Sequence, residues 1–190
     1  MLKKLLVTAT VVSAVFISTA MPMFSQASEL SYSYVDLARA ERDADGDKAS
    51  GLRLEASVAL ADFWYIAASS ESLSADNAAS GDPELLLIST GFHRALRDDT
   101  DLVASVGFLN FDNGVSDGDG YQLKLGLRAL PRPRLEAQAA LLHRNIDEQT
   151  LNGWQLGLRF FVKKAISLGL THESFNDDSD ELAVSARLDF

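Results

Sequence analysis

The chain contains no cysteine, few basic side chains and, beyond its first 27 residues, no long apolar run. The missing cysteine excludes a lipoprotein anchor, a disulfide framework and a thiolate metal site. Basic residues number 17 against 27 acidic ones, and this balance argues against a nucleic-acid partner. Because no second apolar run follows the first, no α-helical membrane span is expected downstream. Apolar residues with helical spacing are also missing along the chain.

The N-terminal segment has the three parts of a secretory signal peptide. Two lysines precede an apolar run that begins at Leu5, and Ser25-Gln26-Ala27 offers small residues where a signal peptidase reads. We therefore expect a cleaved signal peptide at residues 1–27 and one mature domain at residues 28–190. Without the two lysines the mature chain keeps 15 basic and 27 acidic side chains, a formal charge of −12.

Apolar and polar residues then alternate with period two, the pattern of strands that present two different faces. The clearest example is the run from Leu52 to Leu60, and the runs that begin at Tyr121 and Trp154 repeat it. The pattern predicts ten strands, at about 30–39, 50–60, 63–72, 85–94, 101–111, 120–130, 134–144, 153–162, 166–175 and 181–190.

The connectors alternate between long polar stretches and tight turns. Acidic stretches that contain Gly or Asn follow odd-numbered segments, for example at 41–48, whereas Pro131-Arg132-Pro133 is one of the tight turns. This rhythm is typical of an outer-membrane barrel with both termini on the periplasmic side. The predicted fold is therefore all-β, an antiparallel up-and-down transmembrane β-barrel of about ten strands, with eight strands as an alternative. A soluble β-sandwich is the competing fold, because it alternates in the same way.

The two faces of the segments have different predicted roles. Aromatic rings at the lipid–water interfaces form the predicted girdle, which consists of Tyr121, Trp154, Phe92, Phe160 and Phe190. The outward apolar band includes Leu54, Val58, Leu123, Leu125, Leu156, Leu158, Leu168, Leu170, Val184 and Leu188.

Charged residues lie mid-segment on the opposite face, which points into the lumen of a barrel. The predicted lumen charges are Arg53, Glu55, Lys124, Arg128, Glu136, Arg159, Glu173 and Arg187. Ten strands enclose a lumen only slightly wider than that of an eight-stranded barrel, which side chains fill, so a plugged, self-neutralised core is expected. A water path beside Gly126, Gly157 and Gly169 is the alternative, and it would make the protein a narrow channel.

The last segment alternates without a break and ends on an aromatic residue. Its apolar positions are Leu182, Val184, Ala186, Leu188 and Phe190. Such an ending looks like the signal by which the barrel-assembly machinery takes up outer-membrane proteins. Only a closed barrel lets strands cross lipid without an unpaired edge, so this strand is predicted to pair with the one that begins near Leu30.

These features together resemble a family of small outer-membrane barrels from Gram-negative bacteria, of the opacity-like kind. The resemblance rests on Leu30-Ser31-Tyr32-Ser33-Tyr34-Val35, the acidic Asp43-Ala44-Asp45-Gly46-Asp47, the Leu-rich second segment and the terminal Phe190. It is closest to barrels once described as immunity-activating surface proteins of plant-associated bacteria. The resemblance implies location and fold more than activity, since small barrels include adhesins, enzymes and narrow channels.

Two enzymatic alternatives involve histidines. His172 and Ser174 share one strand face near the extracellular rim, a spacing similar to that of lipid A deacylase barrels, where a His–Ser pair attacks an ester. No acid can be assigned to orient the pair. An omptin-like protease has ten strands and uses acids and a histidine at its mouth, but here only His143 near Asp147 and Glu148 is comparable.

The acidic stretch with Asp43, Asp45 and Asp47 presents oxygens at alternate positions, as a calcium site does, but its spacing does not match an EF-hand. A solvated turn is the favoured interpretation. The sequence thus predicts a monomeric, non-catalytic outer-membrane protein without cofactors, with a structural or surface-interaction role. Its expected partners are outer-membrane lipid, lipopolysaccharide and, during biogenesis, the barrel-assembly machinery.

Overall fold

The structure of the protein is a computed structural model that describes residues 30–44, 46–76, 82–112, 114, 116–147, 149–176 and 179–190. The expected signal peptide lies outside these residues and stays a prediction. The strands are β1 (Tyr34–Ala44), β2 (Asp47–Ala61), β3 (Trp64–Ala75), β4 (Glu84–Arg97), β5 (Thr100–Asp112), β6 (Asp117–Arg132), β7 (Leu135–Ile146), β8 (Gln149–Lys163), β9 (Ile166–Phe175) and β10 (Ser179–Asp189). No helix in the described ranges is long and apolar enough to cross a membrane.

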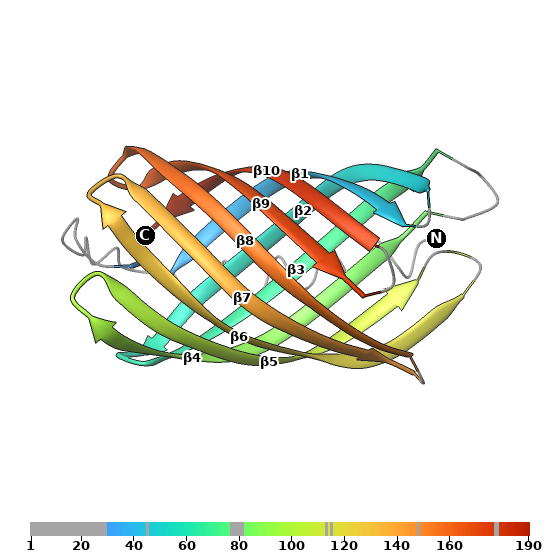
Figure 1. Ribbon diagram of the computed structural model, residues 1–190, viewed down its shortest axis with the longest axis horizontal. Helices are drawn as coiled ribbons and strands as arrows, with labels where there is room; N and C mark the ends of the chain where they lie inside the picture. Colours follow the sequence, from blue (N-terminus) through green and yellow to red (C-terminus); the bar gives the residue numbers. More distant parts are fainter. Residues whose placement is uncertain are drawn as a thin grey trace.

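The ten strands form one closed antiparallel barrel (Figure 1). Each strand pairs with its neighbours in sequence, and β10 closes the barrel on β1 in a register that runs from Tyr34↔Asp189 to Ala44↔Ser179. Phe190 extends this seam, because its N–H donates a 3.0 Å hydrogen bond to the carbonyl of Ser33. The predicted all-β barrel of ten strands is confirmed, and the alternatives of eight strands and a sandwich are wrong.

The first strand begins later than the sequence predicts. It starts at Tyr34 instead of residue 30, because Leu30–Ser33 leave the sheet and enter the barrel, where Tyr32 is buried. The ninth strand, by contrast, has the predicted bounds.

The connectors differ from the sequence-based prediction more than the strands do. The turn end of the barrel, where the chain terminates, has tight turns at Asp62-Phe63, Asp98-Asp99, Pro133-Arg134 and Lys164-Ala165. At the opposite end, which we call the loop end, most connectors are nearly as short. The predicted loop at 41–48 is wrong, because β1 and β2 continue as a hairpin up to Ala44↔Asp47. The polar ends of strands resemble loops in a sequence. Among the loop-end connectors, only the one at 76–83 is long.

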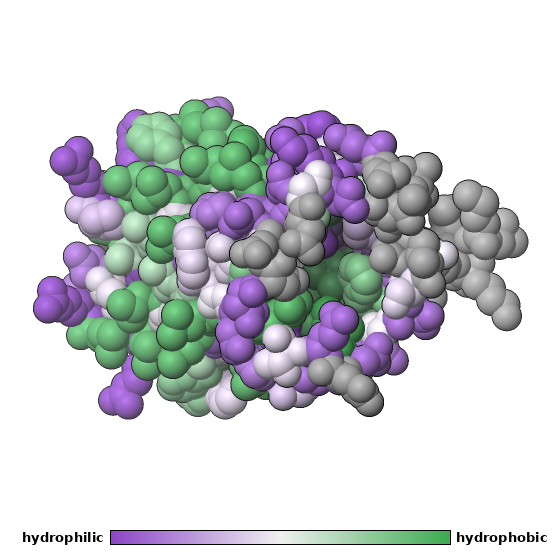
Figure 2. Space-filling model, turned by 45° about the vertical axis from the view of Figure 1, so that its right-hand side comes forward, coloured by the Kyte–Doolittle hydropathy of each residue, from purple (hydrophilic) through white to green (hydrophobic). Residues whose placement is uncertain are grey.

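The outer surface carries the apolar face of every strand. Leu125 and Val184 leave 53% and 60% of their surface exposed, and they belong to a belt of exposed large apolar side chains around the barrel. Figure 2 shows this apolar surface on the half of the barrel toward the turn end, with polar residues at its outer edge and again at the loop end. A belt of this extent is unfavourable in water and suits a bilayer, where a closed barrel satisfies its own backbone.

Candidate functional site

The lumen holds buried charged residues in paired groups. Near the loop end three arginines and three glutamates form the loop-side cluster, which consists of Arg42, Arg53, Arg144, Glu71, Glu173 and Glu181. Arg42 and Arg53 both contact Glu181, at 2.7 and 2.6 Å. Arg144 lies 3.0 Å from Glu173. Equal numbers of opposite charges make this cluster close to neutral.

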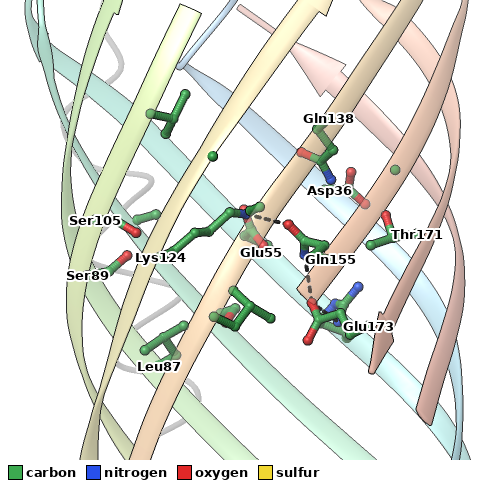
Figure 3. A pocket seen from close by; sticks show the side chains of 18 of the residues that line it. Asp36, Glu55, Leu87, Ser89, Ser105, Lys124, Gln138, Gln155, Thr171 and Glu173 are labelled. Atoms are coloured by element: carbon green, nitrogen blue, oxygen red, sulfur yellow. Dashed lines mark hydrogen bonds and ion pairs between the residues drawn. The ribbon is translucent and has the colours of Figure 1, made fainter. Parts of the chain in front are cut away.

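The middle of the lumen carries a hydrogen-bonded chain of side chains from β6, β8 and β9. Lys124 on β6 donates a 2.6 Å hydrogen bond to Gln155 on β8, whose amide nitrogen donates one of 2.7 Å to Glu173 (Figure 3). On the β1–β2 side, the Tyr34 hydroxyl donates to Glu55 at 2.5 Å. These bonds hold long side chains in place inside the lumen.

The turn-side cluster is built around one glutamate. Glu136 accepts hydrogen bonds from Arg128 at 3.0 Å and from Arg187 at 2.9 Å. Arg187 also lies 3.0 Å from Asp189 and stacks 4.9 Å above the ring of Tyr34. All three members of the Glu136 triad are at least nine-tenths buried. A buried charge is tolerated only when it is paired in this way.

The segment Leu30–Ser33 closes the turn end of the lumen. The ring of Tyr32 stacks on His93 at 3.7 Å, and the guanidinium of Arg128 lies 4.6 Å from its centroid. Its hydroxyl donates a 2.8 Å hydrogen bond to Asp101. Burial raises the pKa of the Tyr32 phenol, so the hydroxyl keeps its proton and remains a donor.

The backbone of this segment is also fixed to the barrel wall. Ser57 donates a 2.8 Å hydrogen bond to the Tyr32 carbonyl, and Arg128 donates one of 3.1 Å to the Ser31 carbonyl. Leu30–Ser33 therefore form a stopper with defined contacts, and Tyr32 is its central side chain.

Two cavities open between these groups. The inner cavity, of about 160 Å³, is lined by all eight predicted lumen charges and reaches Tyr32. Its volume suits on the order of ten water molecules. At the loop end lies a larger cavity of about 600 Å³, which we call the mouth chamber. Arg42, Leu85, Arg144 and Glu181 line both cavities, so the two cavities adjoin at the loop-side cluster, one opening at the loop end and the other reaching the stopper.

The glycines considered for a water path do not provide one by themselves. A side chain at Gly157 would meet Gln138 at 2.5 Å, and one at Gly169 would meet Arg159 at 3.0 Å. A side chain at Gly126 would lie 2.4 Å from the Ala139 carbonyl oxygen and 2.6 Å from the Ala140 Cβ. Neighbouring residues therefore use the space above these glycines, and the remaining volume lies elsewhere in the lumen.

The predicted lumen set omitted several residues that the structure brings into the same groups. They are Asp36, Arg42, Glu71, Asp101, Arg144, Glu181 and Asp189. Strand alternation could have found some of them, because residues an even number of positions apart lie on the same face of a strand. Glu181 lies on the same face of β10 as Arg187, and Asp36 lies on the same face of β1 as Arg42. The role of Tyr32 has no such signal, because the residue precedes its strand.

The predicted girdle and C-terminal residues lie on the outer surface. Tyr121, Trp154, Phe160 and Phe190 are exposed, and Phe92 packs 5.7 Å from Trp64. Phe63 joins this group at 5.9 Å from Phe92, and the sequence interpretation omitted both Phe63 and Trp64. The positions Leu182, Val184, Ala186 and Leu188 in β10, and Phe190 directly after it, all face outward.

His172 and Ser174 also face outward, away from the lumen. The Nδ1 of His172 lies 3.2 Å from the Glu181 carbonyl and its Nε2 lies 3.8 Å from Asp180, while its ring packs against Trp154 at 5.0 Å. No hydrogen bond between His172 and Ser174 is found in the described part of the chain. These contacts place His172 in a polar group at the rim.

The other candidate residues lie at the loop end. Asp43 accepts a hydrogen bond from the Gly46 N–H at 3.1 Å, whereas Asp45 lies outside the described residues. Within the described ranges no three His, Asp or Glu side chains are arranged to hold a metal ion. His143 faces outward and lies 2.8 Å from Asn152.

A closed barrel with an apolar exterior and a lumen of paired charges defines a membrane-spanning β-barrel of the outer-membrane type. Several solved porins have a similar fold. The KdgM porin, in complex with disordered oligogalacturonate, matches 83% of this chain and 99% of its own with a TM-score of 0.52 and 8% identity. An outer-membrane channel from Pseudomonas putida F1 matches 90% of this chain and 100% of its own, with a TM-score of 0.51 and 11% identity.

The NanC porin gives a TM-score of 0.51 at 7% identity, over 82% of this chain and 100% of its own. At such identities the likeness shows the fold alone. The chain matches no protein-family model and no curated protein sequence. The finer resemblance to opacity-like proteins and to barrels of plant-associated bacteria therefore stays a prediction.

Proposed function

We propose that the protein is a narrow, non-catalytic channel of the bacterial outer membrane. The observation that carries this proposal is the hollow interior, in which the mouth chamber and the inner cavity adjoin and the inner cavity reaches Tyr32. A structural anchor needs no such hollow. The porin-like folds of the three similar structures are consistent with a channel. The short connectors at the loop end favour it over a surface-interaction role, since they offer little loop surface.

In this proposal the loop end faces the outside of the cell and both termini are periplasmic. Outer-membrane lipid and lipopolysaccharide surround the apolar belt, and the barrel-assembly machinery inserts the chain as a monomer. The Leu30–Ser33 stopper closes the periplasmic end of the channel, and solute passes when Tyr32 leaves its stack. Neither nucleic acid nor a cofactor takes part.

Planar-bilayer recording of the purified protein tests the channel. We expect low conductance with the stopper in place and a severalfold increase for Tyr32→Ala, because the substitution removes the ring that fills the turn end. Tyr32→Phe keeps the ring and should behave like the unmodified protein. Tyr121→Ala, which removes a tyrosine from the outer surface, is the matched control and should leave the current unchanged. Silence of both the unmodified protein and Tyr32→Ala would overturn the proposal.

A further inference from the structure

The mouth chamber has features of a ligand-binding site. We propose that it binds a small amphipathic cation, with the apolar part of the ligand against the chamber wall and its charge near the carboxylates of the rim. The inference names a solute class for the channel and in that respect rests on the proposed function. Binding itself requires only the chamber.

The wall of the mouth chamber is apolar, although it lies on the lumen side of the barrel. Five half-buried side chains from five different strands line it, namely Leu85, Phe111, Ile146, Leu151 and Phe175. Figure 2 looks toward the loop end and shows apolar surface inside a hollow that polar residues surround. Barrel interiors are normally polar, and partly exposed apolar side chains around a cavity mark a binding site more often than a folding requirement.

The size of the mouth chamber fits a small molecule. Its volume of about 600 Å³ lies within the range of ligand-binding pockets, roughly 300–1,000 Å³. A single aromatic ring with a compact charged head is smaller than this. The chamber is therefore large enough to hold such a ligand.

The charges around the chamber favour a cation over an anion. Five carboxylates and three cations line it, and apart from Glu181, which is paired with Arg42, the carboxylates are Asp47, Asp117, Asp147 and Asp180. The two arginines at the floor are already paired, Arg42 with Glu71 and Glu181, and Arg144 with Glu173. The Lys48 ammonium lies 3.9 Å from Asp43. The field at the rim is therefore negative, which concentrates cations and repels anions.

Two probes of similar size and opposite charge test this inference. Benzyltrimethylammonium and benzylsulfonate are titrated separately into the full protein in zwitterionic nanodiscs, and the heat from empty nanodiscs is subtracted. We expect the cation to bind roughly tenfold more tightly than the anion. Equal affinity for the two ions would overturn the choice of a cation.

Two variants on β5 test the location. Phe111→Ala removes a ring from the chamber wall and should weaken binding of the cation severalfold. Phe108→Ala removes a ring from the lipid-facing side of the same strand and should leave binding unchanged. Heat-modifiable migration shows whether each variant is folded, and Leu151→Ala replaces Phe111→Ala if the latter is not. Equal effects of the wall variant and of Phe108→Ala would overturn the site.

The rim is tested by Asp147→Asn. Asp147 has a positive φ of 52°, a conformation that Asn tolerates, so the backbone should be retained. The preference for the cation should fall, and an unchanged preference would contradict the role of the rim. Binding without bilayer current would overturn the proposed channel but not the chamber, whereas current without binding would overturn the chamber alone.

Discussion

Glu136 is the residue on which the turn-side cluster depends. It accepts hydrogen bonds from Arg128 and Arg187, and it is 3% exposed. Glu136→Gln removes the negative charge and leaves two buried guanidiniums without their shared carboxylate. Breaking a buried ion pair in this way costs about 3 kcal/mol or more. We expect a loss of this size in the free energy of unfolding, measured by urea titration of the barrel in detergent.

Glu41→Gln is the control for this change. Glu41 lies on the outer face of β1 with 68% of its side chain exposed, 3.9 Å from Arg39. An exposed pair contributes at most about 1 kcal/mol, so this variant should unfold close to the unmodified protein. Equal losses for both variants would mean that burial of Glu136 has no special effect.

Gly91 makes room for the side chains behind the stopper. A side chain at this position would lie 2.0 Å from the Tyr65 ring, and Tyr65 stacks on Tyr32 at 5.3 Å. Gly91→Ala should therefore displace Tyr65, cost about 1–3 kcal/mol of stability as overpacking does, and raise the conductance. Adding Tyr65→Leu should restore the lost stability. If Gly91→Ala changed neither unfolding nor current, the proposed packing behind Tyr32 would be wrong.

At the scale of strands, local alternation predicts most of the fold. The ten segments and their antiparallel order follow from the period of two, because a strand with one lipid face and one lumen face must alternate. Strand ends are harder to predict, because polar residues continue into the paired ends of strands such as β1 and β2. Asp43 and Lys48, for example, read as loop residues but are register partners.

The candidate site could be predicted only in part. The alternation of side chains along a strand assigns a face to each charged residue, but it does not say which charges meet across the lumen. Arg42 and Glu181 are 139 residues apart, and their contact depends on the closure of β1 on β10. The stopper could not be predicted, because Tyr32 lies on no strand. The mouth chamber was also missed, since its apolar residues come from five strands.

The C-terminal strand allows a prediction for assembly. Deleting Phe190 removes an outward aromatic ring and one hydrogen bond of the seam, whereas the register from Tyr34 to Ala44 is retained. We expect less folded protein in the outer membrane, with normal bilayer current from the molecules that do fold. Phe190→Tyr keeps the ring and is the control. Heat-modifiable migration of membrane fractions measures the folded share, and a normal share after deletion would contradict an assembly role.

At the scale of the whole molecule, the two ends of the barrel differ in structure and should face different compartments. Every connector at the turn end is a dipeptide, whereas the mouth chamber opens at the loop end. Short turns belong to the periplasmic side of bacterial barrels, and the stopper would then close the channel from inside the cell envelope. The missing cysteine makes this orientation easy to test, because a single introduced thiol is the only site of reaction.

Asp117→Cys and Lys164→Cys form the matched pair for this test, since both positions are exposed and lie at opposite ends of the barrel. On intact cells a membrane-impermeant maleimide should label Asp117→Cys, because the loop end faces the medium, and should leave Lys164→Cys unlabelled. After permeabilisation both should react, which shows that the thiol at Lys164 is available. Labelling of Lys164→Cys alone on intact cells would reverse the orientation. The stopper would then face the medium, and the mouth chamber would bind its ligand from the periplasm.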